Sequence, residues 1–286
     1  QLENCFLQVG NYTSSSESSR GFFSRGAKDI SALGNLTFDA IKNGKYSQCT
    51  LSTDAYGMIT IADQDCTDEI RSKFKIDNNG LVVTLDLLPN FQAINMDNLY
   101  ANLCCLGVLR DINANANNNI VLNKYVGNST NNVYSKRITY VYPESELILD
   151  LEYAIPNYTN NIAKFVVYKT KNPLPQPNNE SCMTFGFLIK DRSTIYEVNT
   201  LDDRFRWNPY INYLYGYISC DAIKDFLIDY DINGSSITNP YPIIDPSRLT
   251  GVNKQHPLII NMLSIPLVRI DLILRELNKS VSAKTV

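Results

Sequence analysis

The chain has 286 residues, of which 44% are hydrophobic and 19% are charged, and its formal net charge is −3. This length and apolar content suffice for a full hydrophobic core, in one large domain or in two modest lobes. They exclude a disordered, highly charged chain, and the slight acidity gives no general attraction to nucleic acid. No run approaches the ~20 continuous apolar residues of a membrane-spanning helix. We therefore expect a soluble globular protein with no direct membrane span.

The predicted elements begin with short β-strands after a serine-rich arm at 12–26. Residues 49–53 and 58–62 are rich in β-branched side chains, and residues 54–57 between them have the Asp-first, Gly-last preference of a type I turn. The further predicted strands are 81–87, 137–142, 147–153, 163–170, 182–189 and 193–198, with a polar loop at 111–119. Short strands rich in Tyr, Val, Ile and Thr predict a mainly β fold of β-sandwich-like antiparallel sheets.

A proline-rich stretch is the predicted domain boundary. Pro173, Pro175 and Pro177 lie within residues 172–181, a composition typical of an extended linker. The sequence thus predicts an N-terminal β-rich lobe at 1–171 and a C-terminal β-rich lobe with helices at 182–286. One continuous domain is the alternative.

One or two short helices are predicted near the C-terminus. Ile223, Phe226, Leu227 and Tyr230 have helical spacing, and Gly234 follows as a stop signal. Residues 267–277 fit both a helical stripe and a strand alternation, and Pro266 just before them favours the helix.

Two features predict an extracellular protein. The chain begins with Gln rather than Met, as a mature chain would after removal of a signal peptide. It also contains seven Asn-x-Ser/Thr sequons, a small excess over chance. The candidate glycosylation sites are Asn11, Asn35, Asn128, Asn157, Asn179, Asn233 and Asn278.

The seven cysteines predict a disulfide-bonded chain in an oxidising compartment. We expect Cys49 and Cys66 to be bonded across the hairpin at 54–57, and we expect Cys182 and Cys220 to be disulfide-bonded as well. Adjacent Cys104 and Cys105 cannot close on one another, and the odd thiol is available for linking chains. Zinc is not expected, since there is no C-x-x-C pair and only one histidine.

A cluster of aromatic and arginine side chains is the predicted binding site. Strand alternation would place Tyr213, Tyr215 and Tyr217 on one face, and aromatic and arginine residues are typical anchors of recognition surfaces. The predicted site consists of Arg204, Arg206, Trp207, Tyr210, Tyr213, Tyr215 and Tyr217. The arginines would donate to carboxylates such as sialic or peptide acids. The alternative is a tyrosine ladder that packs against a second sheet or under a loop.

Other candidate chemistry is weaker. His256 lies before a proline in a polar stretch and reads as a surface loop residue. Asp150 and Glu152 share one strand face at a spacing that suits glycoside hydrolysis, although a solvated sheet face explains them as well. Residues 229–235 resemble half of a calcium loop, but Pro240 stands where the bidentate Glu belongs, and a helix end accounts for the same letters.

These patterns predict an extracellular, N-glycosylated, disulfide-bonded binding module. It would be the ectodomain of a cell-surface or virion glycoprotein in attachment, adhesion or capture of a host protein, with a protein or a glycan as its partner. We expect no enzymatic activity, no cofactor, no metal and no nucleic acid. The alternatives are a secreted glycan-active hydrolase that uses a carboxylate pair, and a structural wall or coat component linked through its unpaired cysteine.

Overall fold

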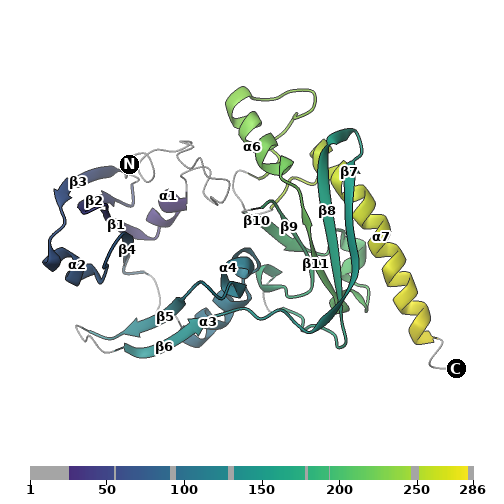
Figure 1. The fold of residues 1–286 in the computed structure, drawn as a ribbon, viewed down its shortest axis with the longest axis horizontal. Coiled ribbons are helices and arrows are strands. Elements are labelled where there is room, and N and C mark those ends of the chain that lie inside the picture. The colour runs from purple at the N-terminus through teal and green to yellow at the C-terminus, as the bar shows by residue number, and fades with distance from the viewer. Residues whose placement is uncertain are drawn as a thin grey trace. The chain divides into compact units, whose positions relative to one another are not determined.

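The computed structural model describes residues 26–54, 56–90, 95–127, 132–177, 180–192, 194–245 and 251–282 (Figure 1). The chain divides into two compact units, Gln1–Ala93 and Ile94–Val286. Asn11, Asn128 and Asn179 of the predicted glycosylation sites lie outside the described residues, as does Cys5.

The first unit is a four-stranded antiparallel sheet in the order β3-β2-β1-β4. Its elements are α1 (Gly26–Ser31), β1 (Gly34–Lys42), β2 (Lys45–Leu51), β3 (Gly57–Asp65), α2 (Asp68–Phe74) and β4 (Gly80–Leu87). The predicted strands at 49–53, 58–62 and 81–87 are therefore confirmed.

Turn chemistry fixes the register of this sheet. Asn43 and Gly44 both have positive φ, 51° and 78°, so an Asn-Gly pair makes the two-residue turn between β1 and β2. The resulting register brings Leu36, Phe38, Cys49 and Leu51 together as a small buried cluster.

The second unit contains a five-stranded sheet, a two-stranded hairpin and most of the helices. Its helical elements are α3 (Met96–Cys105), η2 (Gly107–Leu109), α4 (Arg110–Ala114), η3 (Glu180–Cys182), α5 (Asp203–Arg206), η4 (Ile211–Tyr213), α6 (Ala222–Asn233) and α7 (Pro257–Ser282). Its strands are β5 (Ile120–Tyr125), β6 (Asn132–Ile138), β7 (Ser145–Ile155), β8 (Tyr158–Thr170), β9 (Gly186–Lys190), β10 (Ile195–Asn199) and β11 (Leu214–Ser219).

The five-stranded sheet has the order β10-β9-β11-β8-β7, with β11 in the centre. β11 pairs antiparallel with β8 and parallel with β9. At Gly216 a Cβ atom would lie 1.9 Å from the carbonyl oxygen of Val166, so only glycine permits this close approach. The proline-rich stretch 172–181 connects β8 to β9, two strands that both pair with β11.

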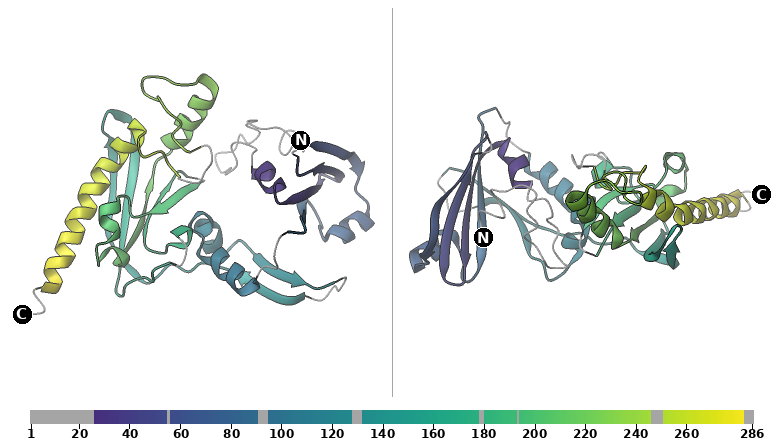
Figure 2. Two further views of the ribbon diagram at one scale, coloured as in Figure 1. Left: turned by 180° about the vertical axis from the view of Figure 1, so that it is seen from behind. Right: turned by 90° about the horizontal axis from the view of Figure 1, so that it is seen from above.

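Helix α7 lies along β7 and β8 in both Figure 1 and Figure 2. The hydroxyl of Tyr153 on β7 donates to the carbonyl of Met262 at 2.6 Å, and Ile259, Ile270 and Leu274 are buried on the same helix. By length and composition Pro257–Lys279 is also apolar enough to cross a membrane, which is weak support for a span because core helices pass the same test.

The structure confirms a protein rich in antiparallel β-sheets with helix near the C-terminus, but the described residues form seven α-helices, and α7 is 26 residues long rather than short. α6 ends at Gly234 with φ 75°, as the stop signal predicts. α7 begins at Pro257 rather than near Pro266, which lies inside the helix. The β-sandwich is not confirmed, since a helix rather than a second sheet packs along β7 and β8.

His256 is fully buried, and its interpretation as a surface residue is wrong. Its Nδ1 accepts from the backbone N–H of Leu258 at 3.1 Å and so caps α7, while Nε2 donates to Asn239 Oδ1 at 3.0 Å. The ring also meets Phe226 edge-on. Burial lowers the pKa of His256 to about 4, so the imidazole is neutral near pH 7.

We predict that replacing His256 by Asn changes the pH dependence of stability. Asn keeps a cap acceptor but does not titrate. A histidine with a lowered folded pKa contributes stability above its unfolded pKa of 6.5 and loses it as the pH falls toward 4. The destabilisation caused by H256N should therefore shrink by about 3 kcal/mol from pH 6.5 to pH 4 in denaturant titrations. A constant difference across this range would contradict the buried, neutral assignment.

Candidate functional site

The predicted tyrosine face lies in the core of the second unit. Tyr215 is only 5% exposed, and β11, the strand that carries it, is paired with a neighbouring strand along each edge. Its ring stacks on Tyr168 at 5.1 Å and on Tyr142 at 6.1 Å, and its hydroxyl lies 2.7 Å from Ser145 Oγ. The exposed recognition face is therefore wrong, and the alternative tyrosine ladder is nearer to what the structure shows.

The other two tyrosines of that face are half-buried and do not share a strand. Tyr213 ends η4 before β11 begins, so strand alternation does not extend to it. Its ring lies 6.3 Å from that of Tyr210. Tyr217 lies beneath Lys190 Nζ, which is 5.0 Å from the ring centroid.

The two predicted arginines are already paired with carboxylates. Arg204 Nε lies 3.2 Å from Asp202 Oδ2, and Arg206 pairs with Glu180. Trp207 is 84% exposed, and the Arg206 guanidinium lies 5.9 Å from its ring centroid. Of the predicted residues, Arg204, Arg206 and Trp207 thus remain on an accessible surface.

The structure corrects the predicted disulfide between Cys49 and Cys66, since both thiols are free. Cys49 lies opposite Ile59 in the ladder, whereas the backbone N–H of Cys66 donates to the carbonyl of Gly44. The two cysteines are thus separated by five positions along β2, about 16 Å at the rise of a strand and beyond the range of a disulfide.

Cys182 and Cys220 are also free thiols. Cys182 lies in η3 before β9 begins, whereas the backbone N–H of Cys220 donates to Lys190 at the other end of β9. A strand of this length separates them by about 13 Å. Burial raises the pKa of the Cys220 thiol to about 11, which makes it an inert core residue.

The predicted carboxylate pair is an exposed ion cluster. Lys164 Nζ lies 3.0 Å from Asp150 Oδ1 and 4.0 Å from Glu152 Oε1. In the calcium-like segment, Asp229 accepts from the side chains of Asn233 and Asn239, at 2.9 Å each, and so serves α6. Within the described ranges no group of three or more metal-ligating side chains is present.

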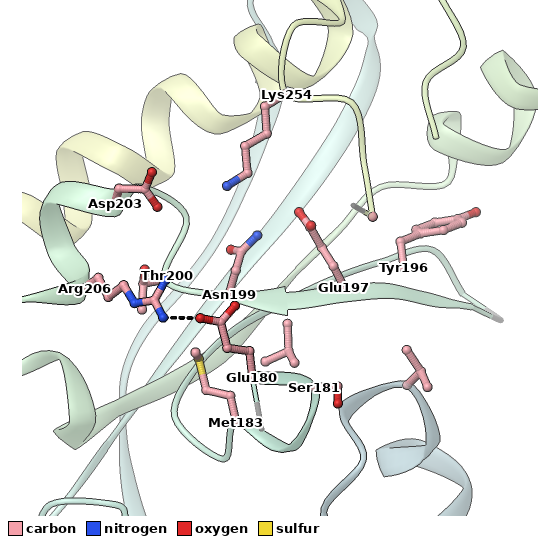
Figure 3. A pocket seen from close by; sticks show the side chains of 13 residues that line it. Glu180, Ser181, Met183, Tyr196, Glu197, Asn199, Thr200, Asp203, Arg206 and Lys254 are labelled. Atoms are coloured by element: carbon pink, nitrogen blue, oxygen red, sulfur yellow. Dashed lines mark hydrogen bonds and ion pairs between the residues drawn. The ribbon is translucent and has the colours of Figure 1, made fainter. Parts of the chain in front are cut away.

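A polar pocket of about 400 Å³ lies beside β10, within the size range of small-ligand sites (Figure 3). η2, η3 and α5 border it, and so does the segment around Gly251. Its lining residues are Val108, Glu180, Ser181, Met183, Tyr196, Glu197, Val198, Asn199, Thr200, Asp203, Arg206, Gly251 and Lys254. We call this site the Glu197 pocket.

Glu197 is the unusual titratable group of the pocket. Burial raises the pKa of Glu197 to about 7, while the charge of Lys254, the amide of Asn199 and the backbone N–H of Val252 act in the opposite direction. At Gly251, where φ is 72°, a Cβ atom would lie 2.2 Å from Glu197 Oε2. A glycine here lets the backbone approach the carboxyl group and shield it from water.

Two buried polar atoms of the pocket have no hydrogen-bond partner in the part of the chain that the structure describes. They are Glu197 Oε1 and Asn199 Nδ2. Asn199 Oδ1, in contrast, accepts from the backbone N–H of Leu201 at 2.8 Å, which fixes the orientation of the amide. A buried acceptor beside a buried donor, both open, is a feature that a bound polar group would complete.

Sequence reasoning missed this pocket, although one signal for it was present. Glu197 lies on the predicted strand 193–198 and Asn199 directly follows it, so continuing the strand by one residue would have placed these two polar side chains on one face. The remaining lining comes from η2, η3, α5 and the 251–254 segment, which only the tertiary fold brings together.

No protein-family model and no curated protein matches the sequence. A solved structure described as the N-terminal domain of a DNA repair protein is similar at 12% identity and a TM-score of 0.39. That similarity covers 76% of this chain and 69% of the other. A resemblance at this level assigns neither a fold family nor a function.

We predict that replacing Glu197 by Gln stabilises the protein at neutral and alkaline pH. A carboxyl with a raised folded pKa contributes stability below its unfolded pKa of 4.5 and loses it as the pH rises through about 7. Gln has the same shape and no charge, so the free energy of unfolding of E197Q relative to wild type should increase by about 3 kcal/mol from pH 4.5 to pH 8. Denaturant titrations measure this difference, and Glu276→Gln on the exposed face of α7 is the control. A pH-independent effect of E197Q would show that the carboxyl is solvated.

Proposed function

We propose that this chain is an extracellular binding module that takes a polar ligand, part of a protein or of a glycan, into the Glu197 pocket. It would act as the ectodomain of a cell-surface or virion glycoprotein in attachment, adhesion or host-protein capture. The observation that carries the proposal is the open pair of buried atoms, Glu197 Oε1 and Asn199 Nδ2. Leaving buried polar atoms unbonded costs about 1–3 kcal/mol each, so this pair needs a hydrogen-bonding partner, and in this proposal the ligand supplies it.

The extracellular part of the proposal is supported by the exposure of four sequons. Asn35, Asn157, Asn233 and Asn278 are all exposed side chains. Asn157 occupies the turn between β7 and β8 with φ 62°, and its Nδ2, the atom to which a glycan would be attached, donates to Asn261 Oδ1 of α7 at 2.9 Å, a contact that a glycan would have to accommodate.

We predict that the chain carries N-glycans when it passes through a eukaryotic secretory pathway. Asn157, at the tip of a hairpin with Thr in the third place of its sequon, should be occupied. Peptide mapping before and after endoglycosidase treatment measures occupancy. An intact mass that does not change on this treatment would contradict the extracellular assignment.

The binding role predicts a specific effect of Asn199→Asp. Asp keeps an oxygen for the N–H of Leu201 but replaces the open donor by a second acceptor. Full-length chain is applied to immobilised glycans and cell-surface proteins. N199D should lower affinity for the captured ligand by about tenfold or more, whereas the control Asn160→Asp, an exposed residue of β8, should not. Equal binding by wild type, N199D and N160D would place the binding site elsewhere.

A glycan-active hydrolase is the second candidate, now with Glu197 in place of Asp150 and Glu152. A carboxyl with a pKa near 7 suits a general acid. Release of reducing ends from polysaccharides, abolished in E197Q, would favour hydrolysis over binding. Capture of intact glycan without release of reducing ends would favour the binding module.

A further inference from the structure

The open atoms of the Glu197 pocket limit the chemistry of its ligand. Glu197 and Asn199 are two positions apart on β10, so their side chains leave the same face of the strand, about 7 Å apart at the Cα atoms. Hydrogen bonding by the Asn199 side chain lowers the pKa of Glu197, but neither Glu197 Oε1 nor Asn199 Nδ2 has a partner in good hydrogen-bond geometry among the described residues, so this contact is at most a weak one. A ligand group that reaches both atoms while Glu197 is ionised has to donate to Glu197 Oε1 and to accept from Asn199 Nδ2.

A hydroxyl group meets both requirements with a single oxygen. It donates its proton to the carboxylate and accepts the amide hydrogen on a lone pair. The carboxyl of Glu197 changes protonation state near neutral pH, and a hydroxyl can bond to either form because it can reverse its role. A carbonyl or an ammonium group lacks one of the two functions.

The charges of the pocket disfavour an anionic ligand. Glu180, Glu197 and Asp203 contribute carboxylates, while the cations are Arg206 and Lys254. Arg206 is engaged by Glu180, so its guanidinium is not free to clamp a phosphate or a sialic acid carboxylate. Arg204 is engaged in the same way by Asp202.

An exposed aromatic side chain lies next to Arg206, one of the residues that line the pocket. Trp207 follows the lining residue Arg206, is 84% exposed, and lies 5.9 Å from the Arg206 guanidinium. An exposed indole offers a large apolar face at low conformational cost, and sugar rings present a matching apolar face of C–H groups. A ligand that is polar at its edge and apolar on its face fits both parts of the site.

We propose that the Glu197 pocket binds an uncharged sugar residue, one ring hydroxyl of which lies between Glu197 and Asn199 while the ring stacks toward Trp207. This inference rests on the proposed binding function and adds the class of ligand. The expected ligand is therefore an uncharged sugar rather than the sialic or peptide acids that unpaired arginines would have favoured.

The test uses the full chain and methyl glycosides of glucose, galactose and mannose, each with its monodeoxy analogues, in calorimetric titrations. N-acetylneuraminic acid, inorganic phosphate and uridine are the comparison ligands. We expect a methyl glycoside to bind, one deoxy analogue to bind about tenfold more weakly, and Trp207→Ala to weaken binding about fivefold.

A swap of donor and acceptor gives the sharpest test. N199D alone presents two acceptors and should weaken sugar binding about tenfold. The double variant E197Q/N199D restores a donor and an acceptor with their order reversed, and a hydroxyl can reverse both bonds without moving. It should therefore regain affinity to within about threefold of wild type, and N160D should bind as wild type does. An amide ligand would have to rotate by about half a turn in the site to regain both hydrogen bonds in the double variant.

The outcomes separate the ligand class from the binding function. Failure of every methyl glycoside, together with Asn199-dependent binding of another ligand, overturns the sugar class and leaves the proposed function standing. Binding of phosphate or N-acetylneuraminic acid would also overturn the proposal of an uncharged sugar ligand. Sugar binding that N199D leaves unchanged would overturn it as well. If the ligand captured in the immobilised panel is indifferent to N199D, the proposed function itself fails.

Discussion

Strand β11 is hydrogen-bonded along both edges, and this constraint fixes the positions of the neighbouring strands β8 and β9. Pairing with β8 on one side requires the glycine at position 216, and pairing with β9 on the other fixes where β9 and then β10 lie. Most side chains on β11 are buried, and Tyr215 is a packing residue between Tyr168 and Tyr142. In this five-stranded sheet, β10 lies at one edge and contributes Glu197 and Asn199 to the Glu197 pocket.

The Glu197 pocket and the cap of α7 contain two buried titratable groups with opposite effects. As the pH rises, the contribution of His256 to the free energy of unfolding increases, whereas the contribution of Glu197 decreases. Between pH 4.5 and 6.5 the two contributions offset one another, so the wild-type stability varies less with pH than either group alone would imply. His256 has all its hydrogen bonds in place and serves the fold, whereas Glu197 retains an open oxygen toward the pocket. That difference separates a structural residue from a candidate site residue.

Much of the local structure could be predicted because local signals carried it. β-branched runs and turn residues identified β2, β3, β4, β7 and β8, and periodicity with a glycine stop identified α6. Asn43-Gly44 was a further hairpin signal that sequence reasoning did not use. Helix α2 was missed, although Thr67 caps it as a standard N-cap by accepting from Ile70.

The binding site could not be predicted because it depends on strand order. The alternation of Tyr215 and Tyr217 indicates only that the two side chains share one face of a strand. The burial of Tyr215 depends on the central position of β11 in the sheet, which the sequence does not reveal. The failed disulfide has the same cause, since Cys49 lies near the turn and Cys66 far from it once the register is known. The pocket lining comes from segments between residues 108 and 254, and no sequence spacing links them.

The central claim is that Glu197 is held in a shielded site with one oxygen open to a ligand. The pKa of the Glu197 carboxyl group tests this most directly. It is measured from the chemical shift of the carboxyl carbon in an NMR titration of the full chain labelled with ¹³C at Glu, and E197Q is used to assign the resonance. The account predicts a midpoint at about 7 in the free protein. A midpoint near the ordinary value of 4.5 would show a solvated carboxylate and would contradict the site described here.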